Sequence, residues 1–193
     1  MPADPLQTLP IDVRDAFLLS GWQPGISRRR CKTYKFTMHK LACIVLNELE
    51  GLKVRPLQLD KPCRPLGVEF CVDIAEGYED EIGEIEKRLK TRISPIANVG
   101  NGVAIMLLAE TGHVLLLGYS SRGLLLAGMS FGEGVKAILA GEMKRPVFFT
   151  DDPQKLFWND QWDPQDASTF FLGYEGLNSD SPAKPGYGYG PRT

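Results

Sequence analysis

Residues 103–118 read VAIMLLAETGHVLLLG. Two apolar runs in this stretch, residues 103–109 and 113–117, each have the length of a β-strand, and only the short link ETG separates them. A link this short joins antiparallel neighbours, because a parallel connection needs a dozen or more residues. A third apolar run follows at residues 124–127. The pattern predicts three consecutive strands joined by hairpins.

Two further strands are expected nearer the N-terminus. Residues 52–59 are apolar at intervals, but Pro56 restricts such a strand to a sheet edge or a bulge. Apolar side chains then occupy every second position from Val68 to Ile74, which is typical of a half-buried strand. Pro95 ends any helix that approaches it, and NVGNG at residues 98–102 is expected to be a turn.

Helical periodicity predicts two helices before the first strand. Residues 10–19 begin at a proline, and Gly21 follows them. Thr37 is the expected N-cap of a second helix, residues 38–49, in which apolar side chains recur at three- and four-residue intervals. Gly51 follows this apolar stripe as the expected residue that ends the helix.

Two more helices are expected later in the chain. Residues 78–90 have one apolar face, acidic residues in the first turns and basic residues in the last, as the helix dipole favours. Ser130 and Glu133 form an S-x-x-E capping box before a helix that Gly141 ends. The predicted element order is therefore ααββαβββα. This order predicts an α+β fold with helices packed on a largely antiparallel sheet.

The composition restricts the class of protein. The chain has 193 residues, 43% of them hydrophobic, and a formal net charge of −2. A near-neutral charge does not direct a protein to nucleic acid or to an anionic membrane. We find no signal peptide and no apolar run long enough to span a bilayer. The four cysteines lack CxxC spacing and are interpreted as reduced thiols in a cytoplasmic protein: Cys31, Cys43, Cys63 and Cys71.

No pattern of catalytic residues is evident. His39 and His113 are the only histidines, and neither belongs to a metal-binding or triad motif. The segment LLLAGMSFGEGVKAIL has the strand–glycine–helix order of phosphate-binding loops, but its glycine spacing does not match. Glu133 would also repel a phosphate there, so the capping box is the preferred interpretation. We expect no enzymatic activity, no metal and no cofactor.

The segment from Asp73 to Glu86 contains no basic residue. One interpretation is a solvated helix face whose charges match the helix dipole. The other is a surface for a basic partner, such as a nuclease or deaminase toxin, because opposite charge speeds association. The candidate partner-binding residues are Glu76, Glu79, Asp80 and Glu81.

A tryptophan and a basic cluster stand together in GWQPGISRRR, residues 21–30. Trp22 is expected to be a structural anchor that packs the first turn onto the sheet, as Gly51, Ser130 and Glu133 are expected to be structural at their helix ends. Arg28, Arg29 and Arg30 are a second candidate partner-binding group, for which a structural role is an equal alternative. No recognition motif accompanies them, so direct nucleic-acid binding is not expected.

The chain divides by composition into a domain, residues 1–145, and an aromatic and acidic C-terminal extension, residues 146–193. We expect the aromatic side chains of the extension to clamp onto its own domain. A short peptide motif that docks into a partner is the alternative. The last residues, rich in glycine and proline, are expected to be disordered.

Several of these segments, in this order, resemble the SUKH superfamily, especially its third subgroup of bacterial immunity proteins. The resemblance covers roughly residues 18–142 and depends on order and spacing. The matching segments are GWQPGISRR, LNELEGLKV, VEFCVDIAEG, ISPIANVGNG, the strands around AETGHV, and GMSFGEGVKAILAGE.

This resemblance implies a non-enzymatic α+β domain that binds a polymorphic toxin, often a nuclease or nucleic-acid deaminase, and blocks it. The superfamily also contains eukaryotic and viral interaction scaffolds, so a scaffold whose aromatic extension recruits clients is the second hypothesis. An enzyme that uses carboxylates such as Glu76 and Asp80 is the third. The sequence does not determine the oligomeric state.

Overall fold

The fold is described from a computed structural model, in which residues 4–28, 36–57, 65–119, 123–142, 145–149 and 170–172 are described. In chain order, the elements are α1 (Ile11–Leu19), α2 (Lys40–Leu49), β1 (Lys53–Val54), β2 (Val68–Glu69), the 3₁₀ helix η1 (Asp73–Ala75), α3 (Glu79–Leu89), β3 (Ile93–Val99), β4 (Ala104–Ala109), β5 (Val114–Gly118), β6 (Leu124–Gly128), α4 (Phe131–Ala140), β7 (Arg145–Phe149) and β8 (Phe170–Leu172).

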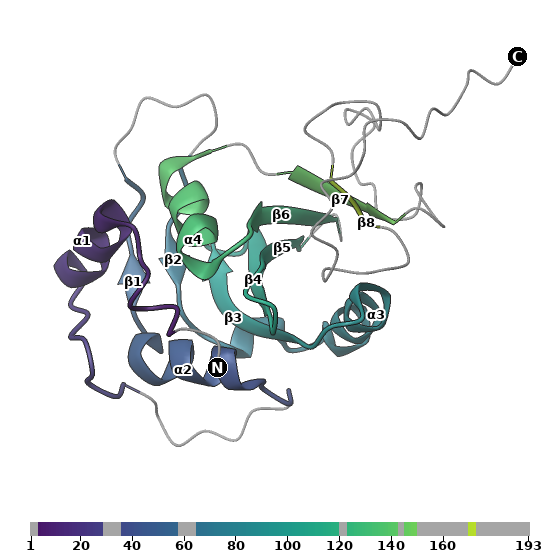
Figure 1. The fold of residues 1–193 in the computed structure, drawn as a ribbon, viewed down its shortest axis with the longest axis horizontal. Coiled ribbons are helices and arrows are strands. Elements are labelled where there is room, and N and C mark those ends of the chain that lie inside the picture. The colour runs from purple at the N-terminus through teal and green to yellow at the C-terminus, as the bar shows by residue number, and fades with distance from the viewer. Residues whose placement is uncertain are drawn as a thin grey trace, which may run out of the picture.

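The strands form one sheet in which neighbours in space are neighbours in sequence, from β1 to β8. All pairs from β1 to β7 are antiparallel, and β8 is parallel to β7. The ETG link joins β4 to β5 as the sequence predicts, with Leu107 opposite Leu115. The α+β class and the antiparallel sheet are therefore confirmed (Figure 1).

Each face of the sheet has its own layer of helices (Figure 1). Alternate residues of β4 show the division, because Met106 and Leu108 pack with α1, α2 and α4, whereas Ile105 and Leu107 pack with α3. All four side chains are fully buried. The central strands are covered on both sides, which explains why they read as continuous apolar runs rather than as alternating ones.

Three strands are absent from the predicted order: β3, β7 and β8. β3 lies between β2 and β4, and it contains Pro95 opposite Leu107. From the sequence alone, Pro95 predicted only the end of a helix. The sheet accommodates the proline because the register shifts between Pro95 and Ala97, and a bulge tolerates a residue without a backbone N–H. The expected strand from Val68 to Ile74 is also shorter, since β2 ends at Glu69 and η1 begins at Asp73.

The second helix begins at a different N-cap from the expected one. His39, not Thr37, caps α2: its Nδ1 atom accepts a hydrogen bond from the Ala42 N–H at 3.2 Å. The imidazole Nε2 bonds to the Leu108 carbonyl at 2.8 Å, and the His39 N–H donates to Ser94 Oγ at 3.1 Å. Tertiary contacts to β3 and β4 therefore set the start of this helix.

The glycine-rich segment before α4 serves close packing. A Cβ atom on Gly134 would overlap the Val114 side chain, and one on Gly128 would overlap the backbone of Gly134. The first turn of α4 can therefore lie directly against β5 and β6. Backbone contact of this kind fills the place where a phosphate-binding loop would need open space.

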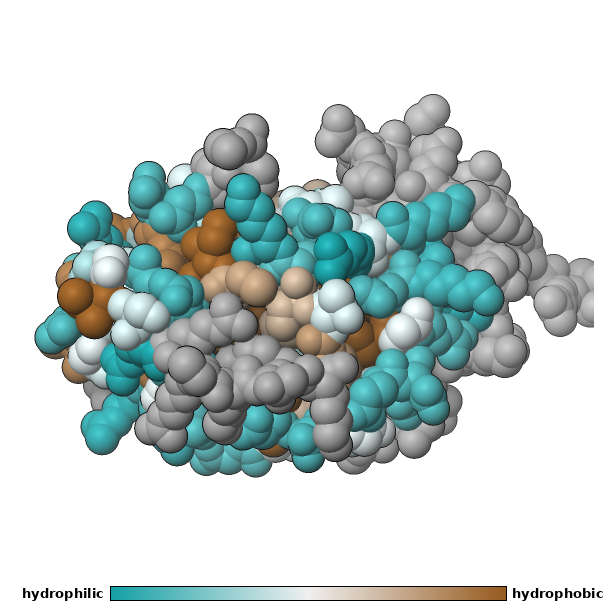
Figure 2. Space-filling model, turned by 90° about the horizontal axis from the view of Figure 1, so that it is seen from below, coloured by the Kyte–Doolittle hydropathy of each residue, from teal (hydrophilic) through white to brown (hydrophobic). Residues whose placement is uncertain are grey.

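Figure 2 shows mostly hydrophilic residues on one face of the molecule, with small apolar areas between them. No helix within the described ranges is both long enough and apolar enough to cross a membrane. Cys43 and Cys71 are free thiols, and burial raises the pKa of Cys71. Cys31 and Cys63 lie outside the described residues.

Candidate functional site

The acidic residues singled out in the sequence lie together at the start of α3. Glu79, Asp80 and Glu81 form its first turn, and Glu76 precedes it. With two further exposed carboxylates, this group is called the acidic surface: Asp73, Glu76, Glu79, Asp80, Glu81 and Glu84. Carboxylates near a helix N-terminus are stabilised by the helix dipole, so the fold tolerates this concentration of negative charge.

The backbone under the acidic surface is firmly held. The Tyr119 hydroxyl donates to the Ile74 carbonyl at 2.6 Å, and the Tyr78 hydroxyl donates to the Tyr119 carbonyl at 3.2 Å. The two rings pack edge to face with centroids 5.3 Å apart. Burial raises the pKa of Tyr119 to about 12, so this contact is neutral at physiological pH. The tyrosine pair thus ties the end of β5 to the segment that carries the carboxylates.

The carboxylates of the acidic surface differ in the hydrogen-bond and ion-pair partners that they have within the protein. Glu79 accepts the Gly77 N–H at 2.8 Å, and Glu84 pairs with Arg88 at 3.2 Å. Asp80 is exposed, and within the described part of the chain its carboxylate has no hydrogen-bond or ion-pair partner. Asp80 is therefore the member of the acidic surface most available to another molecule.

The tryptophan corner, residues 20–28, is built differently. Trp22 is only 4% exposed and packs edge-on against Phe17 with ring centroids 5.9 Å apart. Its indole Nε1–H donates to Glu48 Oε2 at 3.2 Å, and the same oxygen accepts the Gly25 N–H at 3.0 Å. One carboxylate on α2 therefore fixes both ends of the turn.

Arg28 makes hydrogen bonds within the tryptophan corner and to α2, through both its backbone and its side chain. Its N–H donates to the Asn47 carbonyl at 2.7 Å, and its guanidinium donates to the Gly21 carbonyl at 2.9 Å. Ser27 Oγ donates to Asn47 Oδ1 at 2.8 Å. Arg29 and Arg30, the other two residues of that candidate group, lie outside the described residues.

The sequence analysis missed Asn47 and Glu48. They stand next to each other near the end of α2, where nothing in their local pattern indicates that they hold a loop from another part of the chain. The remaining structural candidates lie at helix ends. Gly51 has a φ of +78°, and Ser130 Oγ accepts the Glu133 N–H at 3.3 Å. Glu133 Oε2 accepts the Met129 N–H at 3.2 Å.

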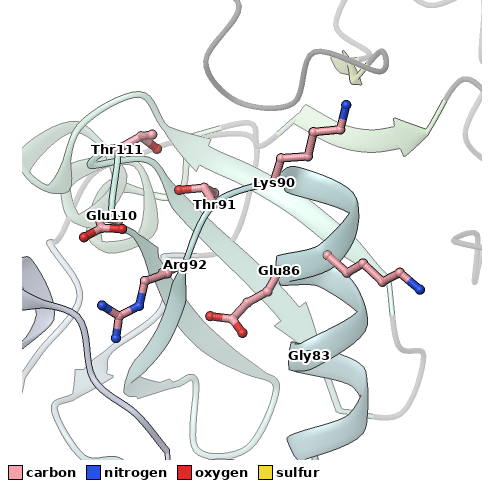
Figure 3. Close-up of a pocket in the computed structure, with 8 residues that line it drawn as sticks. Gly83, Glu86, Lys90, Thr91, Arg92, Glu110 and Thr111 are labelled. Atoms are coloured by element: carbon pink, nitrogen blue, oxygen red, sulfur yellow. The ribbon is translucent and has the colours of Figure 1, made fainter.

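A hollow of about 610 Å³ lies at the opposite end of α3. Its lining carries charges of both signs: Gly83, Glu86, Lys87, Lys90, Thr91, Arg92, Glu110 and Thr111. Figure 3 shows Glu86 extending toward the segment just before β3 that carries Arg92, while Lys90 extends away. Glu86 Oε1 accepts the Ile93 N–H at 2.7 Å, so this carboxylate has a structural role. Neither Glu76 nor Asp80, the carboxylates of the enzyme hypothesis, lines the hollow.

Both histidines are buried and lie within hydrogen-bond distance of other groups of the chain. Both ring nitrogens of His39 are hydrogen-bonded in the core, and His113 Nδ1 lies 2.8 Å from Thr111 Oγ1. Burial lowers the pKa of each imidazole. Across the described ranges, no three histidine, cysteine, aspartate or glutamate side chains come together in a way that could hold a metal ion.

Comparison with known proteins adds to this description. No curated protein and no solved structure matches the chain. A family model described as SUKH-3 immunity protein matches residues 9–141, a range that runs from just before α1 to the end of α4. Immunity proteins neutralise toxins by binding and are not enzymes. Because the match covers more than half of its length, this chain belongs to the SUKH-3 immunity protein family.

Proposed function

We propose that this chain neutralises a toxin that is a nuclease or a nucleic-acid deaminase, and that it does so by placing its acidic surface over the toxin's nucleic-acid-binding site. The observation that carries the proposal is the position of the six carboxylates on one firmly held corner of the fold. Enzymes that bind nucleic acid present basic residues to the phosphates. A rigid acidic surface competes for the same residues.

Charge and rigidity support this assignment together. Opposite charge raises the association rate, which matters for a protein that must capture a toxin before the toxin acts. The tyrosine pair fixes the backbone before binding, so less conformational freedom is lost on association. We infer that the complex forms in the cytoplasm, where half-buried thiols such as Cys43 stay reduced.

The test is a double charge reversal on the acidic surface, with a single charge reversal elsewhere as the control. Glu79→Lys with Asp80→Lys should slow association with the toxin domain encoded beside this chain by about ten-fold or more at low salt. It should also abolish protection when the two are co-expressed. Glu110→Lys changes charge in the same sense at an exposed position in the β4–β5 link, at the other end of α3, and should leave the association rate nearly unchanged.

Two results would contradict the proposal. One is full protection by the Glu79→Lys, Asp80→Lys variant. The other is an equal loss of binding in Glu110→Lys, because the effect would then come from net charge alone. Stopped-flow mixing measures these association rates, and the effect of Glu79→Lys with Asp80→Lys should shrink at higher salt, since contacts between charged surfaces weaken as salt is added.

A further inference from the structure

The outer face of α1 is unusually apolar for an exposed helix. Of the six large apolar side chains that are exposed among the described residues, three belong to α1: Ile11 at 73%, Leu18 at 42% and Leu19 at 90%. Apolar atoms are visible at the left end of Figure 2, the end that α1 and the following loop occupy in Figure 1. Scattered single residues would need no explanation, but three on nine residues of helix indicate a contact surface.

This exposure does not come from a loosely attached helix. Val13 and Phe17, on the opposite side of α1, are completely buried. The Asp12 carboxylate pairs with Lys136 of α4 at 3.0 Å, and Phe17 packs edge-on against Phe70 with centroids 5.6 Å apart. The outward face is therefore presented in a fixed orientation.

The exposed residues form a stripe with opposite charges on its two flanks. Ile11, Arg14, Asp15 and Leu18 are spaced i, i+3, i+4 and i+7, and all four are exposed. At about 100° per residue, Ile11 and Leu18 lie along the middle, Arg14 on one flank, and Asp15 with Leu19 on the other. Within the described ranges, neither charged side chain has a hydrogen-bond or ion-pair partner. We call this set the α1 stripe.

We propose that the α1 stripe is the contact surface for a second copy of this chain. Two stripes can pack face to face with the helices parallel, about a two-fold axis that runs along them. Arg14 of each copy then lies beside Asp15 of the other on both flanks, while the apolar centres pack together. With antiparallel helices arginine would face arginine, so the charge pattern selects the parallel arrangement.

The expected dimer is weak. α1 is about 13 Å long, so two such helices bury far less than the roughly 1,600 Å² of a standard interface. A dissociation constant between about 1 µM and 1 mM fits an interface of this size. The acidic surface lies on α3, at the other side of the sheet, and stays free in this dimer (Figure 1).

Reversal of single charges tests the arrangement. Arg14→Asp gives a stripe with two acidic flanks, and Asp15→Arg gives one with two basic flanks. Sedimentation equilibrium up to about 1 mM protein should show each variant dimerising about ten-fold more weakly than the wild type, because both ion pairs become repulsive. A 1:1 mixture of the two variants should associate again, since acidic flanks then face basic ones.

A matched pair of polar substitutions tests the apolar centre. Leu18→Gln and Met129→Gln replace side chains of similar exposure, 42% and 50%, at different places on the surface. Only Leu18→Gln should weaken the dimer, and urea unfolding should show that both variants remain folded. The proposal is overturned if the wild type is monomeric throughout, if the mixture does not associate, or if Met129→Gln weakens the dimer equally.

The same variants distinguish this surface from the toxin-binding one. The Arg14, Asp15, Leu18 and Met129 variants should all still protect cells against the toxin. This expectation does not depend on whether the acidic-surface variants lose protection. If the α1 variants lose protection while self-association is unchanged, the stripe binds the toxin rather than a second copy, and the dimer proposal is wrong.

Discussion

The tryptophan corner and the acidic surface look similar in the sequence, since each is a cluster of charges beside glycines. In the structure they differ in where the side chains find partners. At the tryptophan corner, Trp22, Glu48 and Arg28 all bond to other parts of the same chain. At the acidic surface, the tyrosine pair holds the backbone, while Asp80 has no hydrogen-bond or ion-pair partner among the residues that the structure describes. Internal bonds give the first a structural role. At the second, Glu79 and Glu84 also have internal partners, and Asp80 is the residue most available to another molecule.

The largest expected effect is at the tryptophan corner. Trp22→Ala should lower the free energy of unfolding by about 3–5 kcal/mol, because it removes a buried indole and its packing on Phe17. Urea unfolding measures this loss. Toxin binding per folded molecule should not change, and a specific loss of binding would break the comparison between the two regions.

A smaller loss is expected at the acceptor of the same corner. Glu48→Ala leaves the Trp22 indole N–H and the Gly25 N–H without their shared acceptor, which should cost about 1–3 kcal/mol of stability. Glu48→Gln keeps a carbonyl oxygen and should recover part of that stability. Equal unfolding curves for Glu48→Ala and the wild type would show that this carboxylate does not hold the corner.

Moderate acid should separate the stability of the fold from binding at the acidic surface. The folded state lowers the pKa of His39, chiefly through burial, so the unfolded chain takes up a proton on this residue at higher pH than the folded chain does. The stability from neutral His39 is complete above its unfolded pKa of about 6.5 and falls as the pH drops below it. His113 contributes with the same sign. The acidic surface contains no histidine, so toxin binding per folded molecule should persist while stability declines.

The control for this pH dependence is His39→Gln. This variant lacks the titrating group at the α2 N-cap, so its unfolding free energy should change less than that of the wild type between pH 7 and pH 5. Identical pH profiles for the two proteins would assign the acid sensitivity to other groups.

The smallest effect on stability is expected at Asp80. Asp80→Asn removes a charge that has no partner within the described part of the chain, so the free energy of unfolding should stay within about 0.5 kcal/mol of the wild-type value. Toxin association should nevertheless slow, and the difference should shrink as salt is added. A large change in stability would mean that Asp80 has a structural role.

Much of the fold could be predicted because its signals are local. The ETG link and its flanking apolar runs indicate an antiparallel hairpin, and the apolar intervals before Gly51 indicate α2. β3 escaped prediction because a proline argues against a strand unless a bulge accommodates it, and the bulge depends on pairing with β4. The His39 cap escaped for a related reason, since its ring is positioned by the Leu108 carbonyl, 69 residues away.

The sequence by itself determined the fold class, the family resemblance and the concentration of acidic residues, because spacing, turn chemistry and charge are properties of neighbouring residues. Only the tertiary structure decided which partners Trp22, Glu48 and Arg28 have. The Trp22 indole and the Arg28 N–H bond to Glu48 and Asn47 of α2, which are too far away in the sequence for a local pattern to indicate the contact. Whether a side chain is free to bind another molecule depends on contacts that exist only once distant parts of the chain have packed together.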